Sequence, residues 1–132
     1  MVRRHIGRDP KRADGVPRSA LTQCERRLGV QLPESIRDYY LLAGRLNQLN
    51  KAHNVLFEPE ELHIKDGYLW FMEENQAVVH WAVPEKQLAK ADPMVYQRVN
   101  ADGTKWYSEK MPFSTFIVRM YDWQAGFADA PT

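Results

Sequence analysis

Two apolar runs separated by a short polar stretch form the most distinctive pattern in the chain. Residues 68–72 (YLWFM) and 77–83 (AVVHWAV) are rich in β-branched and aromatic side chains, and 73–76 (EENQ) lies between them. Runs of this length and composition are typical of a β-hairpin. Neither face of the alternating pattern is clearly polar, so we expect this hairpin to be central in a sheet and covered on both sides.

Two segments before the hairpin have the period of a helix. Residues 19–28 place Leu21, Cys24 and Leu28 on one face, and Gly29 suits the left-handed residue that ends a helix. A second helix is expected over residues 33–43, where proline stands at the first position. The polar, asparagine-rich residues 46–57 predict a long connection, and 58–62 resemble a single helical turn.

The rest of the chain predicts a second hairpin and a closing helix. Residues 94–100 and 105–108 flank a solvent-accessible Asp-Gly turn at 101–104. The last helix has the clearest amphipathic stripe, with Ser114 as its N-cap and Gly126 as its end. Helices followed by antiparallel hairpins and a further helix indicate a single α+β domain. We expect one core that contains Leu21, Leu28, Leu32, Ile36, Tyr40, Phe71, Val79, Trp81, Phe116, Ile117 and Met120.

Charge divides the chain into a basic tail and a mildly acidic body. The 132 residues carry a formal charge of +1. Residues 1–18 hold six basic and two acidic side chains, and residues 19–132 hold 12 basic and 15 acidic ones. Because residues 1–18 lack hydrophobic periodicity, we expect a flexible basic tail there, a folded domain over 19–127 and a short C-terminal tail over 128–132.

Candidate chemistry is sparse. Cys24 shares the apolar stripe of its helix and has no histidine near it in sequence, so we interpret it as a core residue. Glu60 and His63 could share a helix face, but one such pair is a weak metal signal. We find no glycine-rich phosphate loop and no nucleophile motif, and therefore expect no catalytic residue, metal or cofactor.

The sequence also bears on location and on nucleic acids. With one cysteine, no long apolar run and no secretory signal, we expect a cytoplasmic protein without a membrane partner. Four aromatic residues could stack on bases: Trp70, Trp81, Trp106 and Tyr107. The strands carry few of the arginines and lysines that such a surface needs, so we interpret these aromatics as core residues. A nucleic-acid-binding function would depend on the basic tail alone.

Several stretches together resemble the SUKH superfamily, which includes the fungal cell-wall-assembly regulator family and bacterial immunity proteins. The resemblance covers about residues 19–125. Its motifs are Leu32-Pro33-Glu34-Ser35 leading into Tyr39-Tyr40 and Gly44, then Glu74-Asn75-Gln76, Trp81, Asp92-Pro93-Met94-Val95-Tyr96 and the stretch 113–121. The chain departs from the pattern at Ala77, where members often have glycine, and in its basic tail.

The resemblance implies an α+β fold without catalytic residues and a role in binding proteins. Many bacterial members are immunity proteins that neutralise a cognate toxin, often a nuclease or deaminase, by direct docking, and others are regulatory interaction modules. The alternative from another class is a small ligand-binding or hydrolytic enzyme whose site is not visible in the sequence. A deep pocket with convergent polar groups would favour that enzyme.

Acidic residues around the first hairpin are the candidate docking site. A basic toxin would be steered to an acidic surface, and an aromatic residue beside it could serve as an anchor. We expect Glu58, Glu60, Glu61 and Asp66 to cluster, with Glu73 and Glu74 at a separate position. The predicted partner-binding residues are Glu58, Glu60, Glu61, Asp66, Glu73, Glu74, Trp106 and Tyr107.

Overall fold

The computed structural model describes residues 8–9, 11–100, 103 and 105–129, with side chains as far as residue 123. It confirms an α+β fold. The helices are α2 (Arg18–Leu28), α3 (Glu34–Ala43), α4 (Asn47–Asn50) and α5 (Phe113–Asp129), and short 3-10 turns are η1 (Arg12–Asp14), η2 (Pro59–Glu61) and η3 (Glu85–Gln87). The strands are β1 (Val55–Leu56), β2 (His63–Lys65), β3 (Tyr68–Glu73), β4 (Val79–Pro84), β5 (Met94–Val99) and β6 (Tyr107–Pro112).

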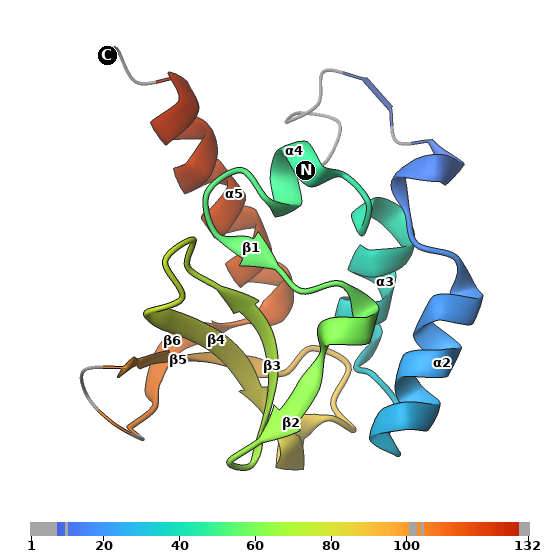
Figure 1. Ribbon diagram of the computed structural model, residues 1–132, viewed down its shortest axis with the longest axis vertical. Helices are drawn as coiled ribbons and strands as arrows, with labels where there is room; N and C mark the ends of the chain where they lie inside the picture. The colour runs from blue at the N-terminus through green and yellow to red at the C-terminus, as the bar shows by residue number, and fades with distance from the viewer. Residues whose placement is uncertain (1–7, 10, 101–102, 104, 130–132) are drawn as a thin grey trace.

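The strands form one antiparallel sheet around the predicted central hairpin. Their order is β1-β3-β4-β5-β6, and β2 also pairs with β3. The hairpin β3–β4 is confirmed, and its register shifts between Trp70 and Met72 because Phe71 is an extra, bulged residue. The bulge allows both Phe71 and Met72 to be buried completely. Figure 1 shows the helices gathered above and to the right of the strands.

The two faces of the sheet are covered differently. On the helical face, Phe71 meets the rings of Phe113 and Phe116 in α5, and Trp81 meets Phe116. The other face carries Trp70 and other aromatic side chains of the sheet itself, which cover one another. Both sides of the hairpin are therefore covered, as expected, but on this side the cover is the mutual stacking of rings rather than helices.

The core agrees with the sequence prediction. Of the predicted core residues, Leu28, Val79 and Met120 are partly buried and pack against the core, and the others are buried. Gly29 adopts the left-handed conformation (φ 72°) that ends α2, as its sequence position indicates. Cys24 is buried in the same core, which confirms its interpretation as a core residue.

Two predicted helix boundaries are wrong. Helix α5 begins at Phe113, so Ser114 lies inside its first turn and is not the N-cap. Asp92 caps this turn, because its carboxylate accepts hydrogen bonds from the Ser114 backbone N–H (3.0 Å) and from the Ser114 hydroxyl. An acidic cap favours a helix N-terminus because exposed N–H groups and the helix dipole are positive there. At the other end, α5 continues through Gly126 to Asp129, so the predicted tail at 128–132 begins inside the helix.

Residues 46–57 are more ordered than their polarity suggests. They contain α4 and β1, and the side chains of Asn50 and Asn54 are buried. Asn50 is satisfied inside the protein, because its Nδ2 donates to the carbonyl of Ala43 at 2.7 Å. Burying an amide costs little free energy when its hydrogen bonds are made. In the sequence alone, an asparagine suggests a solvated loop.

The expectation of a flexible tail up to residue 18 is wrong for its described part. The N–H of Val16 donates to Tyr40 O (2.9 Å), and the N–H of Arg45 donates to Asp14 O (2.8 Å). Val16 is 5% exposed and belongs to the core. Gly15 lies against α3 so closely that an added Cβ would be 1.7 Å from Leu41 O. Residues 1–7 lie outside the described part of the chain.

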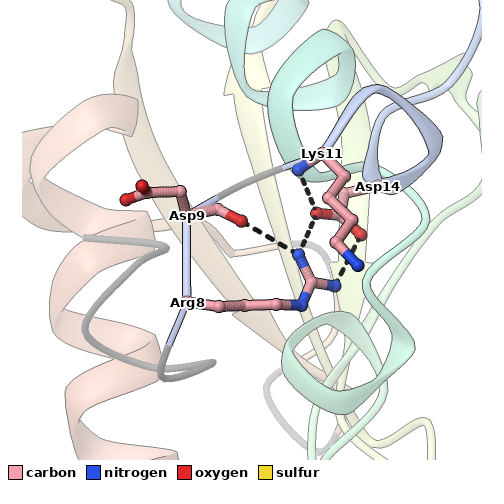
Figure 2. A network of polar contacts seen from close by, with 4 residues as sticks. All are labelled: Arg8, Asp9, Lys11 and Asp14. Carbon is pink, nitrogen blue, oxygen red and sulfur yellow. Dashed lines mark hydrogen bonds and ion pairs between the residues drawn. The ribbon is translucent and has the colours of Figure 1, made fainter.

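Asp14 holds the start of this segment together. Both terminal nitrogens of Arg8 donate hydrogen bonds to the Asp14 carboxylate, at 2.9 and 3.0 Å (Figure 2). The backbone N–H of Lys11 donates to the same carboxylate at 2.6 Å. The Arg8 side-chain hydrogen bonds and then the Lys11 backbone bond lower the pKa of Asp14 from 3.8 to about 2. One of the basic side chains of residues 1–18, Arg8, is therefore bound within the folded structure.

Candidate docking face on the sheet

The sheet face that carries no α5 contacts is the candidate functional site. We call it the aromatic face and define it by Tyr68, Trp70, His80, Tyr96, Arg98 and Trp106. Strand alternation and register explain its composition. Across β3, β4 and β5, one row of paired residues is Trp70, Ala82 and Tyr96. A second row is Glu73, His80 and Arg98. Paired residues point to the same side of a sheet, and His80 and Ala82 are two residues apart in β4, so both rows lie on one face.

The rings of the aromatic face hold one another in place. Tyr68 and Trp106 stack with centroids 4.1 Å apart and planes 20° apart. The ring of Trp70 stands edge-on to Trp106 at 5.3 Å, and Tyr68 contacts Tyr96 at 5.7 Å. Ala82 beneath them is fully buried, and its small side chain leaves room for the rings. The result is a rigid aromatic layer whose outer edges are partly exposed.

Arg98 crosses this layer and ends at Asp66. Its guanidinium carbon lies 5.4 Å from the Trp70 centroid and 5.9 Å from the Trp106 centroid, in cation–π geometry. Its Nη1 donates to Asp66 Oδ2 at 2.9 Å, and its Nε donates to Gly103 O at 2.8 Å. Arg98 therefore fixes the turn between β2 and β3 relative to the end of the β5–β6 hairpin.

His80 and Glu73 lie at the other end of the face. His80 Nε2 is 3.5 Å from Glu73 Oε2. Burial lowers the pKa of His80 below 6.5, and the nearby Glu73 carboxylate opposes this shift without reversing it. Nδ1 of His80 is buried and has no hydrogen-bond partner among the described residues. The face thus has a carboxylate at each end, Asp66 and Glu73, and aromatic rings with Arg98 between them.

The eight predicted partner-binding residues lie at three positions. Asp66, Glu73 and Trp106 border or belong to the aromatic face. Glu58, Glu60 and Glu61 lie around η2, where Glu58 forms an ion pair with Lys51 at 3.0 Å and Glu61 Oε1 accepts the backbone N–H of Glu58 at 2.9 Å. Glu74 lines a cleft on the helical side, and Tyr107 points to that side because its register partner is Gln97.

The expected cluster of Glu58, Glu60, Glu61 and Asp66 does not form. The three-residue strand β2 separates η2 from Asp66, and three residues of strand span about 10 Å. Asp66 is instead paired with Arg98, which comes from a distant part of the chain. Sequence proximity gave the wrong grouping because an ion pair across the sheet decides where the Asp66 carboxylate is held.

Sequence reasoning missed most of the aromatic face. Tyr68 and Tyr96 stand next to the core residues Leu69 and Val95, and this alternation was the available signal. Tyr107, predicted as a core residue, is 44% exposed, whereas Trp70, predicted likewise, is only 5% exposed. Its burial comes from neighbouring strands rather than from helices, and this distinction depends on the strand order, which the local pattern does not contain.

The described residues contain no metal-binding cluster. No three histidine, cysteine, aspartate or glutamate side chains there come close enough together to hold a metal ion. His63 Nδ1 lies 3.0 Å from Glu61 O, so this ring nitrogen contacts the backbone rather than the Glu60 carboxylate. None of the helices in this part of the chain has the length and apolar character needed to cross a membrane.

No family model, no curated protein and no solved structure matches this chain.

Proposed function

We propose that this chain is a non-enzymatic protein-binding module of the SUKH type that acts as an immunity protein. In this proposal it docks one-to-one on a cognate bacterial toxin, of the nuclease or deaminase class, in the cytoplasm and blocks the toxin's active site. The aromatic face is the observation that carries the proposal, because it provides a rigid surface with the composition of a protein interface.

Residue type and order favour the aromatic face as the docking surface. Tryptophan, tyrosine and arginine are the residues most enriched among those that dominate interface energetics. Here Tyr68 and Trp106 are already stacked, and Arg98 is already fixed by Asp66. A surface ordered before binding loses little side-chain entropy when the partner arrives.

Charges around the face favour a basic protein partner. Asp66 and Glu73 lie at its two ends, and Glu60 and Glu61 are exposed beyond the β2 edge. Residues 19–132 carry three more acidic than basic side chains. Such a distribution speeds the encounter with a basic toxin through long-range attraction.

A nucleic-acid partner fits the same face less well. Binding of single-stranded nucleic acid needs rings free for stacking and cations free for phosphates. The Tyr68 and Trp106 rings stack on each other, and the Arg98 guanidinium is bound to Asp66. A protein partner can instead contact the exposed edges of these rings without separating them.

One conformational detail supports the family resemblance. Ala77, the residue that departs from the glycine found in many members, has a φ of 58°. This left-handed conformation favours glycine and costs other residues energy. The hairpin loop therefore has the geometry that the family pattern would require at this position, although this chain carries alanine there.

The test begins with the gene next to the one for this chain, which the proposal expects to encode the toxin domain. Co-expression should rescue growth of cells that make the toxin, and the two purified proteins should form a one-to-one complex in light scattering. Trp106→Ala should weaken the affinity by at least about thirtyfold, as expected for an interface residue worth 2 kcal/mol or more. Tyr107→Ala is the matched control, since Tyr107 is adjacent and 44% exposed but faces the other side.

The acidic residues of η2 are tested separately through kinetics. Reversing Glu60 and Glu61 to lysine should slow association with the toxin and flatten its salt dependence, because both side chains are exposed. An unchanged rate across a salt series would exclude η2 from the docking surface. Toxicity that persists with this chain co-expressed, together with no complex, would overturn the proposed function itself.

A further inference from the structure

A cleft on the helical side of the sheet is the strongest feature that the docking proposal leaves unused. It lies between strands β4–β6 and helix α5 and has a volume of about 350 Å³. Its lining includes Trp81, Gln97, Glu109, Phe116 and Trp123. The volume falls in the range of small-ligand pockets, and the mixture of aromatic walls with a few polar groups is typical of them.

Strand alternation places Glu109 on the cleft side of the sheet, because Tyr107 pairs with Gln97 and Glu109 lies two residues further along β6. The β5–β6 register shifts between Met94 and Tyr96, and β6 accommodates the extra residues with Lys110 at a φ of 60°. The Ser108 hydroxyl oxygen accepts the backbone N–H of Lys110 at 2.9 Å and closes the bulge. Bulges of this kind re-aim side chains at the edges of sheets and next to binding sites.

The carboxylate of Glu109 is poorly compensated. Its Oε1 accepts a hydrogen bond from Gln97 Nε2 at 2.7 Å, and Gln97 is a neutral partner. Burial raises the pKa of Glu109, and the Gln97 hydrogen bond opposes that shift. Removing a carboxylate from water is costly unless a positive charge accompanies it. A cation bound beside Glu109 would supply that charge.

The rest of the cleft is suited to an organic cation. Glu74 contributes a second carboxylate to the lining. Trp81 and Trp123 add indole rings, whose faces attract cations. Two basic residues also line the cleft: Arg119, which is a solvent-exposed residue of α5, and His53, whose ring meets the Trp123 ring edge-on at 5.3 Å. Phe116 and Met120 provide apolar surface against which an alkyl chain can pack.

We propose that this cleft binds an alkylguanidinium group, either of a small molecule or of an arginine side chain. A guanidinium is planar, donates two parallel hydrogen bonds to a carboxylate and stacks on tryptophan, so it matches Glu109 together with the indole rings. Its alkyl stem packs on Phe116 and Met120. The site lies across the sheet from the aromatic face, so it goes beyond the proposed docking function and stands or falls independently.

The test follows the four tryptophan indole N–H signals by NMR while butylguanidinium is added to the full chain. Trp81 and Trp123 line the cleft, whereas Trp70 and Trp106 lie on the aromatic face and serve as internal controls. We expect saturable shifts of the first two signals and none of the last two. Butylurea, which has the same shape without the charge, should not produce these shifts.

Two variants separate the roles of charge and ring. Glu109→Gln keeps an acceptor for Gln97 and should weaken butylguanidinium binding at least about tenfold, because a hydrogen bond between charged groups is lost. Trp123→Ala removes a 48% exposed ring, so the fold should survive while affinity falls. Glu60→Gln is the matched control for charge and should bind like the parent chain.

The outcomes distinguish the two sources of the ligand and can also refute the site. A short peptide with a central arginine that binds as tightly as butylguanidinium assigns the site to an arginine side chain, and saturation by the small molecule alone assigns it to a free ligand. Equal binding of butylurea, equal binding by Glu109→Gln, or no saturable shift at about 20 mM butylguanidinium would overturn the proposal.

Discussion

Tyr39 and Tyr121 donate hydrogen bonds to the same oxygen, Oδ1 of Asn50, at 2.6 and 2.7 Å. All three side chains are buried, and they come from α3, α5 and α4. The rings of the two tyrosines also contact each other, with centroids 5.9 Å apart. Burial raises the pKa of both phenols, so they remain neutral donors at physiological pH. One amide thus joins three helices at the top of the core.

Replacing Asn50 with alanine should destabilise the protein by about 2–4 kcal/mol, because both phenol groups then lose a buried acceptor. Urea unfolding measures this free energy. Tyr121→Phe is the matched control and should cost about 1 kcal/mol, since Asn50 keeps its bond from Tyr39. Equal effects of the two substitutions would mean that Asn50 is not the centre of the network.

Gly15 lies so close to α3 that adding one methyl group, by Gly15→Ala, should destabilise the contact between the N-terminal segment and α3. Its φ is −98°, so the backbone would accept alanine without strain, but the Cβ would collide with Leu41 O. Gly15→Ala should cost about 1–3 kcal/mol, as overpacking does. It should also accelerate hydrogen exchange of the Val16 N–H, which is bonded to Tyr40 O.

Gly29→Ala provides the contrast for that experiment. No atom lies within 4 Å of a Cβ at residue 29, but its φ of 72° strains any residue other than glycine. This substitution should cost about 1–2 kcal/mol through backbone strain, while exchange at Val16 relative to global unfolding stays unchanged. Unaltered exchange at Val16 in Gly15→Ala would show that the contact with Leu41 does not hold the N-terminal segment.

The sequence predicts most of this fold but not its N-terminal segment. The central hairpin and the stripes of α2, α3 and α5 follow hydrophobic periods that burial imposes locally. The segment before α2 has no such period, and its backbone bonds to the body are made by the Val16 N–H and the Asp14 carbonyl. Asn50 was missed for a related reason, since its burial depends on two tyrosines that only the folded chain brings together.

The candidate site was predictable in part. The sequence indicated Trp106, Asp66 and Glu73 but grouped them by position along the chain. Alternation shows that Trp106 and Tyr107 point in opposite directions, yet it does not say which direction faces the helices. The Arg98–Asp66 ion pair depends on the register of β5 and on the β2–β3 turn, which local patterns leave undetermined.

The Arg8 contact predicts the titration of Asp14. Carbon-detected NMR should give this carboxyl a pKa of about 2, compared with an ordinary value of 3.8. Arg8→Ala should raise the pKa toward 3.8 without reaching it, because the Lys11 N–H still donates to the carboxylate. Since the pKa is lower in the folded state, the stability from Asp14 is present above pH 3.8 and lost as pH falls through about 2. A pKa near 3.8 in the parent chain would contradict the network in Figure 2.

The left-handed conformation of Ala77 predicts a stabilising substitution. Ala77→Gly should raise the free energy of unfolding by about 1 kcal/mol, because glycine adopts a positive φ without steric cost. Its greater entropy in the unfolded chain reduces the gain. Thermal unfolding measures the difference. Ala82→Gly is the contrasting control and should destabilise the protein, because Ala82 is buried in a strand. Destabilisation by Ala77→Gly would contradict the loop geometry.

The last prediction concerns acid sensitivity at His80. Burial lowers the pKa of His80 in the folded protein below the ordinary value of 6.5, so the unfolded chain binds a proton there more readily than the folded chain. Stability linked to His80 is therefore present above pH 6.5 and is lost progressively as pH falls through the folded-state pKa. Urea midpoints between pH 7.5 and about 5 should fall further for the parent chain than for His80→Gln, which cannot take up the proton. Glu73→Gln provides the second arm, because the Glu73 carboxylate opposes the shift. Its removal should lower the His80 pKa further in an NMR titration of the imidazole. A parent-chain pKa at or above 6.5, or parallel stability curves for the parent chain and His80→Gln, would refute the lowered pKa of the partly buried His80 on the aromatic face.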